Sequence, residues 1–228
     1  MPDLPAALPT RSLEDAFLEV VDVEGKLIAA LEDLGPIADR DVILLDAGNG
    51  ARARLMSEIG ARVTSITLAP EADEAEALDR IALLPQGQAD VVIALWSQFA
   101  VPGSAFIAAA EKLLRPTGRL LLVHDYGRDD VWNLRPDQHA RQVEWSQRRG
   151  PFLGNGFRVR VIHCWWTFES IDQARELLAV GFGALGEELA GRMRRPRLEY
   201  QVAIYHRSIP IPGIAIVMDE PEAVAAGD

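Results

Sequence analysis

The stretch "VILLDAGNGARARL", residues 42–55, joins an apolar run to a tight glycine turn. The run is continuously apolar, which is typical of a central parallel strand covered on both faces. Asp46, Gly48 and Gly50 follow within a few positions. A turn from a strand into a helix presents free backbone N–H groups, and glycines let a ligand approach that backbone closely. The stretch therefore predicts a buried strand that ends at the floor of a ligand site.

The same alternation of short apolar runs and helical stretches continues to residue 125. We predict strands at 42–47, 62–67, 90–95 and 119–124, and helices near 51–59, 71–79 and 103–115. This order is expected of strands joined by crossover helices, so the fold class is α/β with a doubly wound, mostly parallel sheet. Ligands of such sheets bind beyond the carboxyl ends of the strands, where the strand order reverses.

The segments on either side complete the domain organisation. Residues 1–40 are predicted as a lead-in followed by one helix from Ser12 to Gly35, with an apolar face at helical spacing. Residues 41–208 form the main domain. Its last part contains the strand "RVRVIHCWWTF", a helix near 169–192 and the strand "LEYQVAIYHRS". Two consecutive strands there predict an antiparallel C-terminal edge. Residues 209–228 are Pro-rich and acidic, and an extended or disordered tail is expected.

Residues 128–156 form a polar segment with aromatic side chains. It is either a lid over a substrate or a surface helix followed by a plain loop that anchors itself.

Composition narrows the class of protein and of partner. The chain has 228 residues and a net charge of −11, which would repel a polyanion. The run "GRMRRPR", residues 191–197, fits a helix end, where cations suit the terminal carbonyls. We therefore expect a small-molecule partner rather than nucleic acid. A single cysteine, no secretory signal and no apolar run of about 20 residues predict a cytoplasmic protein without a membrane span.

Four segments together resemble the class I S-adenosylmethionine-dependent methyltransferases. "VILLDAGNG" is similar to the first motif of that family, and "GARVTSITLAPEA" to its second strand and the following turn. "LPQGQADVVIALWS" resembles the approach to its fourth strand, and "AEKLLRPTGRLLLV" its helix and fifth strand. The resemblance implies a Rossmann-like, seven-stranded sheet, S-adenosylmethionine as the cofactor, and methyl transfer to an acceptor that the sequence does not identify.

The resemblance also implies roles for particular residues. The floor under the methionine part of the cofactor would be formed by Asp46, Gly48, Asn49 and Gly50. Leu68 would lie against the adenosine, and Trp96 and Ser97 would face the reactive methyl group or the acceptor.

Two positions depart from the family pattern. Thr67 stands where the family has an acidic residue that binds the ribose hydroxyls, and a hydroxyl is a weaker acceptor than a carboxylate. Glu71 or Asp73 could bind the ribose hydroxyls in place of the missing acidic residue. Both begin a predicted helix, however, where acidic residues are stabilising without any ligand. Arg52 replaces a glycine, so it either crowds the pocket or reaches the carboxylate of the cofactor. These departures leave a second hypothesis open: a methyltransferase-like binding or scaffold protein without catalysis.

Candidate acid–base residues are His124 and Asp125, at the carboxyl end of the fourth predicted strand. The alternative is a strand-end turn that Asp125 caps. His163 and Cys164 are adjacent in a strand, so they point to opposite faces and cannot act as a pair.

Two other functional classes are disfavoured. His139 and His206 lack the spacing of a metal site, and we predict no metal. Nicotinamide-dependent chemistry is disfavoured by the missing third glycine of the dinucleotide fingerprint.

Overall fold

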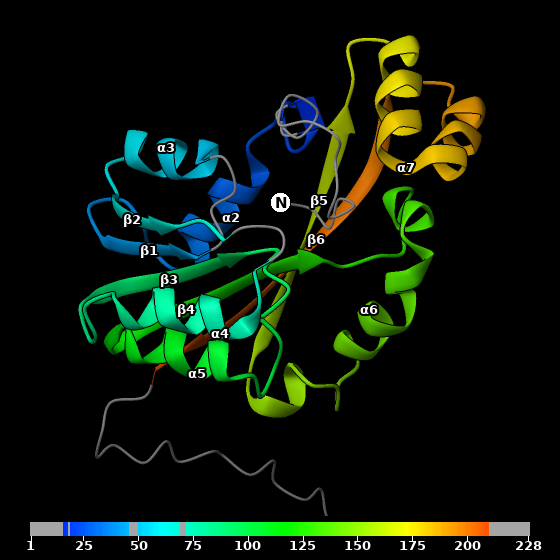
Figure 1. Ribbon diagram of the computed structural model, residues 1–228. Helices are drawn as coiled ribbons and strands as arrows, with labels where there is room; N and C mark the ends of the chain where they lie inside the picture. Colours follow the sequence, from blue (N-terminus) through cyan, green and yellow to red (C-terminus); the bar gives the residue numbers. More distant parts are fainter. Residues whose placement is uncertain (1–15, 18, 46–49, 69–71, 210–228) are drawn as a thin grey trace, which may run out of the picture.

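The computed structural model describes residues 16–17, 19–45, 50–68 and 72–209. Figure 1 shows one central sheet with helices on both faces. The strands are β1 (Asp41–Leu45), β2 (Arg62–Ile66), β3 (Ala89–Leu95), β4 (Leu114–Asp125), β5 (Arg158–Thr167) and β6 (Arg197–Ser208). The α-helices are α2 (Lys26–Leu34), α3 (Ala51–Glu58), α4 (Glu74–Ala82), α5 (Ala105–Lys112), α6 (His139–Trp145) and α7 (Ile171–Arg192). Short 3₁₀ helices are η1 (Val131–Leu134), η2 (Pro136–Gln138) and η3 (Leu153–Asn155).

The strands lie in the order β2-β1-β3-β4-β6-β5. The pairs β1–β2, β1–β3 and β3–β4 are parallel, whereas β6 is antiparallel to both β4 and β5. Five strands thus run in one direction, which confirms the predicted α/β class and its mostly parallel sheet. The strand order reverses between β2 and β3, on either side of β1.

One detail of the predicted sheet is not found and another is confirmed. The described residues form six strands, not seven. A seventh parallel strand would need its own crossover connection of a dozen or more residues. The connection between β2 and β3, residues 67–88, contains only α4 in its described part. The predicted antiparallel C-terminal edge is confirmed, because β6 and β5 end the sheet on that side and pair antiparallel, with β5 outermost. This order follows from pairing between distant segments, which local patterns do not report.

Two hydrophobic cores cover the two faces of the sheet. Alternate residues of β1 divide between them: Leu44 packs with α2, α3 and α7, while Leu45 packs with α4 and α5. The central strands β1, β3 and β4 carry continuous apolar runs because each of them contributes side chains to both cores. The doubly wound arrangement is therefore built into the predicted strand sequences.

The predicted N-terminal helix is interrupted. Val21 forms a β-bridge with Trp166 of β5, and Asp22 has a left-handed φ of 56°. The Asp22 carboxylate then accepts hydrogen bonds from the backbone N–H groups of Lys26 and Leu27, at 2.9 and 2.8 Å, and so caps α2. The single helix was a wrong prediction, because the apolar periodicity continues across a break that the pairing with β5 imposes. Ser12 lies outside the described residues.

Helix α7 is likewise two helical pieces joined at Gly183, whose φ of 56° and ψ of −135° are not helical. The pieces pack so closely that a Cβ on Gly186 would stand 1.9 Å from the carbonyl oxygen of Leu178. Glycine is thus required where the two backbones meet.

Candidate functional site

The strand order reverses beside β1, so the expected ligand position lies beyond the carboxyl ends of β1 and β3. Gly50 caps the start of α3 there with a left-handed φ of 80°, a conformation that favours glycine. The other three predicted floor residues, Asp46, Gly48 and Asn49, lie outside the described residues. The backbone N–H groups at the start of α3 supply partial positive charge to this position.

Trp96 follows β3 in a left-handed conformation, with φ 48°, and its side chain is buried. Its indole Nε1 donates a hydrogen bond to Asp125 Oδ1 at 2.7 Å. The hydroxyl of Tyr200, on β6, donates to the same carboxylate oxygen. Burial, together with the Asp125 carboxylate, raises the pKa of Tyr200 well above its ordinary value, so this hydroxyl stays a donor. Asp125 therefore joins the ends of β3 and β4 to β6.

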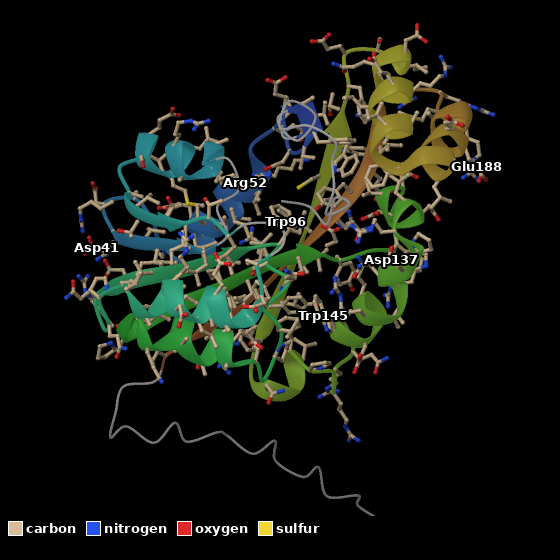
Figure 2. The ribbon with its side chains drawn as sticks, viewed as in Figure 1. Asp41, Arg52, Trp96, Asp137, Trp145 and Glu188 are labelled. Atoms are coloured by element: carbon tan, nitrogen blue, oxygen red, sulfur yellow. The ribbon has the colours of Figure 1, made fainter. Side chains whose placement is uncertain are left out.

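Arg52, in the first turn of α3, is buried over the same tryptophan. Its guanidinium carbon lies 5.1 Å from the centroid of the Trp96 ring, and only 8% of the residue is exposed (Figure 2). Nε and Nη2 are buried and make no hydrogen bond within the described part of the chain. Burial lowers the pKa of this guanidinium from its ordinary value. The charge of Asp22 attracts the guanidinium, but no described carboxylate forms an ion pair with it. A buried cation without such a pair is costly, so its position marks a place where an anionic group would be stabilised.

The other predicted cofactor residues lie at the same edge but in different surroundings. Ser97 is fully buried, and its Oγ has no hydrogen-bond partner among the described residues. Thr67 is exposed just past β2, and Leu68 packs in the α4–α5 core. Asp73 accepts a hydrogen bond from the backbone N–H of Glu76, so it begins α4 as a helix cap.

His124 and Asp125 point to opposite faces of β4. The His124 Nε2 lies 2.9 Å from the carbonyl oxygen of Ala100, and its ring packs against Trp145 and Phe152. The structure therefore brings Asp125 together with Trp96 and places His124 in the other core.

The segment after β4 is held down by aromatic side chains. Phe152 stacks on Tyr205 of β6, with ring centroids 3.9 Å apart, and Trp145 packs edge-on against Phe152. Trp132 lies against His139, with ring centroids 3.8 Å apart. These contacts agree with the second alternative for residues 128–156, a surface helix followed by a loop that anchors itself. Helix α6 and the loop after it cover the face of the sheet that holds His124.

A small polar cavity of about 10 Å³, room for roughly one water molecule, adjoins Asp125. Three buried atoms on its wall have no hydrogen-bond partner among the described residues: Trp132 Nε1, Arg135 Nη1 and Gln142 Oε1. Asp129 also lines it and accepts hydrogen bonds from the backbone N–H groups of Trp132 and Gln201, both at 2.7 Å. Burial raises the pKa of Asp129 to about 6 despite these bonds.

Sequence reasoning missed Tyr200 and Asp129 at this site. Tyr200 stands at an inward position of the alternating strand "LEYQVAIYHRS", which indicated burial but no partner. Asp129 belongs to the run "GRDD", which resembles an ordinary polar turn.

The pair of residues His163 and Cys164 is divided between the two faces of β5, as predicted. His163 is exposed and lies 3.6 Å from Glu199, whereas Cys164 is buried. Burial, followed by the nearby Asp22 carboxylate, raises the pKa of the Cys164 thiol to about 12, which leaves it inert.

The described residues hold neither a metal-ligand cluster nor a membrane-spanning helix. Within them, no three His, Cys, Asp or Glu side chains gather as metal ligands. No helix in that same part is long and apolar enough to cross a membrane.

Searches for relatives gave solved structures but no sequence family. Neither a scan of protein-family models nor a search of curated proteins returned a match. The chain is similar to geranyl diphosphate C-methyltransferase from Streptomyces coelicolor A3(2), with 14% identity over 90% of this chain and 89% of that one, and a TM-score of 0.45. It is also similar to Haemonchus contortus phosphoethanolamine N-methyltransferase 2, with 14% identity over 82% of this chain and 52% of that one, and a TM-score of 0.44.

These similar structures are methyltransferases, the family that the sequence resembles. The functional assignment of this chain rests on its own topology and side chains.

Proposed function

We propose that this protein binds S-adenosylmethionine beyond the carboxyl ends of β1 and β3 and transfers its methyl group to a small-molecule acceptor. The observation that carries the proposal is Arg52, a buried guanidinium at the switch point of the sheet, two of whose nitrogens have no hydrogen-bond partner among the described residues. A carboxylate is the natural partner of such a group. The methionine end of the cofactor carries one.

The residues around Arg52 fit the remainder of such a ligand. The turn Asp46, Gly48, Asn49 and Gly50 would form the floor, and the backbone N–H groups at the start of α3 add to the positive charge that Arg52 supplies. The buried hydroxyl of Ser97 has a hydrogen bond to offer. Thr67 and Leu68, at the end of β2, would lie along the adenosine.

S-adenosylmethionine supplies an electrophilic methyl group on a sulfonium when it is bound. The chain's part is to hold the acceptor in line at about 3 Å and to exclude water. Asp125 acts in this proposal as a positioning residue, because its carboxylate fixes the Trp96 ring through the 2.7 Å hydrogen bond. His124 faces the other core and takes no part. The single, buried cysteine favours a cytoplasmic setting.

The proposal is tested by calorimetric titration with S-adenosylmethionine and S-adenosylhomocysteine. We expect micromolar binding, which corresponds to roughly 8 kcal/mol. Arg52→Met should weaken both ligands by about tenfold or more, because a charge-assisted bond to their carboxylate is lost. Arg54→Met is the matched control, since Arg54 is exposed on the same helix.

Methylthioadenosine, which lacks the amino-acid end, sharpens the test. Its affinity should be the same in wild-type protein and in Arg52→Met, because Arg52 then has no carboxylate to bind. Equal weakening of all three ligands would show that Arg52 supports the site only structurally. No binding of any of them up to millimolar concentration would overturn the proposal and direct the search to protein partners.

A further inference from the structure

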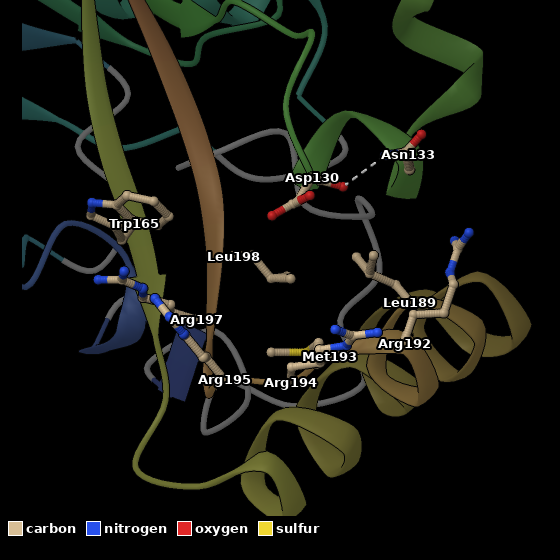
Figure 3. Close-up of a pocket in the computed structure, with 10 residues that line it drawn as sticks. All are labelled: Asp130, Asn133, Trp165, Leu189, Arg192, Met193, Arg194, Arg195, Arg197 and Leu198. Carbon is tan, nitrogen blue, oxygen red and sulfur yellow. Dashed lines mark hydrogen bonds between the residues drawn. The ribbon is translucent and has the colours of Figure 1, made fainter.

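A cavity of about 550 Å³ opens between the end of α7, the start of β6 and η1 (Figure 3). Its walls come from three separate parts of the chain that meet beyond the carboxyl end of β4. The lining residues are Asp130, Asn133, Trp165, Leu189, Arg192, Met193, Arg194, Arg195, Arg197 and Leu198. None of them belongs to the Arg52–Trp96 site.

Four of the ten lining residues are arginines, in a chain whose net charge is −11. Arg192 lies 3.5 Å from Glu188, and Arg197 rests on the Trp165 ring, 4.3 Å from its centroid. Arg194 and Arg195 are exposed and form no ion pair with any described residue. The charges that line the cavity are therefore mainly positive, which is opposite to the net charge of the whole chain.

The one carboxylate among these ten residues does not neutralise the arginines. Asp130 Oδ2 accepts a hydrogen bond from the backbone N–H of Glu199 at 2.9 Å, which joins η1 to β6. Figure 3 shows the Asp130 carboxylate on the wall of the cavity away from Arg194 and Arg195. Its contact holds the wall in place and leaves the arginine side open to an anion.

A helix C-terminus explains only part of this run. Cations are stabilised within the last turn of a helix, and α7 ends at Arg192. Arg194, Arg195 and Arg197 lie beyond it, on the turn into β6 and at the start of that strand. Their concentration around one cavity thus needs another reason.

The floor of the cavity is apolar. Leu189 and Leu198 are buried in the core between the sheet and α7, and Met193 packs against the same core. The half-buried Trp165 ring forms a further apolar wall. A ligand that satisfies this cavity carries an anionic group for the guanidinium forks and an apolar body for the floor.

We propose that this arginine pocket binds a small organic anion, a phosphate ester or a carboxylate with an apolar body. Asp130 stands only five residues after Asp125, so the pocket lies at the same edge of the sheet as the candidate cofactor site. As the place of the methyl acceptor, the pocket rests on the proposed function; as an anion site it stands alone.

The test is calorimetric titration of the full chain without cofactor. The probes are phenyl phosphate, benzoate and the neutral benzyl alcohol, in about 0.15 M salt, where charges farther apart than about 8 Å are screened. The pocket variant is Arg194→Gln/Arg195→Gln. The matched control is Arg148→Gln/Arg149→Gln, an exposed arginine pair in the loop after α6 that removes the same charge elsewhere.

We expect phenyl phosphate or benzoate to bind the wild-type chain, and the tighter of the two identifies the anionic group. The pocket variant should weaken that anion by about tenfold or more, because charge-assisted hydrogen bonds are lost, and the control should change it by less than about twofold. Benzyl alcohol should bind weakly and equally to all three proteins.

Equal losses in the two double variants would overturn the proposal, because they would reflect net charge alone. No binding of either anion up to about 10 mM would also overturn it, since that concentration corresponds to less than about 3 kcal/mol. A single-stranded oligonucleotide is titrated as a further probe. If it binds more tightly than both anions, and this binding is lost in the pocket variant, the ligand is a polyanion and the proposal of a small organic anion is overturned. Because no cofactor is present, the failure of methyl transfer leaves this result unaffected.

Discussion

The two edges of the sheet treat their charges in opposite ways. At the amino edge, Asp41 accepts from Arg62 at 2.7 Å and from Arg115 at 2.8 Å, and Arg115 also binds Asp90 at 2.7 Å. These side chains, at the starts of four neighbouring strands, are paired and largely in contact with solvent. At the carboxyl edge, by contrast, Arg52 is buried and forms no ion pair with any residue that the structure describes.

The two edges differ in whether their charges are paired within the chain. Each exposed ion pair contributes little to stability, but its two charges compensate one another without a ligand. A buried charge without a partner lowers stability, and it persists in a folded chain only where the rest of the structure compensates. In the proposed function, the carboxylate of a bound ligand supplies this compensation at the carboxyl edge, whereas the charges of the amino edge compensate one another.

The largest expected effect is that of Asp125→Ala. This change leaves the Trp96 indole and the Tyr200 hydroxyl as buried donors without an acceptor, so the free energy of unfolding should fall by about 3 kcal/mol. Asp90→Ala, at the amino edge, should lower it by less than about 1 kcal/mol. Urea unfolding measures both. Equal losses at the two edges would break the comparison.

Arg52→Met should raise the stability of the ligand-free protein. The change removes a buried guanidinium that forms no ion pair with the described residues, and it keeps much of the side-chain volume, so we expect a gain of about 1 to 3 kcal/mol. Arg54→Met should leave the free energy of unfolding within about 0.5 kcal/mol of the wild type. If Arg52→Met destabilises the protein in urea unfolding, the chain itself supplies the missing anion.

The pH dependence of stability should carry the signature of Asp129. Burial raises its pKa to about 6 in the folded state, above the ordinary value near 4, so the folded state favours the neutral acid. The resulting stability is fully present below pH 4 and is lost as the pH rises to 6.

Compared with Asp129→Asn, the wild type should lose roughly 2 to 3 kcal/mol more between pH 4 and pH 7. Unfolding profiles of the two proteins that run parallel over this range would contradict the assignment.

Asp41 should show the smallest effect, with the opposite sign. Hydrogen bonds from Arg62 and then Arg115 lower the pKa of Asp41 to about 2. The stability that these hydrogen bonds give is present above the ordinary pKa of an aspartate, near 4, and is lost as the pH falls toward 2. Asp41→Asn should therefore lower the melting temperature slightly at pH 6, and the difference should narrow at pH 3 and in high salt. A difference that widens on acidification would show that another group dominates this edge.

Much of the fold could be predicted because its signals are local. The apolar runs that became β1, β3 and β4 are buried on both faces, and Gly50 does begin α3. The interruption at Asp22 was not predictable from helical periodicity, since it depends on the bridge between Val21 and Trp166, far apart in the chain.

The candidate site was predicted only in outline. Trp96 and Asp125 were both singled out, but the hydrogen bond between them joins residues 29 positions apart, and Tyr200 reaches Asp125 from 75 positions away. The raised pKa of Asp129 depends on how deeply η1 and β6 bury it. Burial of this kind has no local pattern.

The sequence by itself determined the central strands, the crossover helices and the glycine at the start of α3, because each depends on side-chain periodicity and backbone freedom within about ten residues. Tertiary structure alone decided that β6 lies inside β5, that Arg52 is buried over Trp96, and that four arginines surround one cavity. The physical reason is that pairing, desolvation and charge compensation depend on which distant segments pack together, and neighbours along the chain do not carry that information.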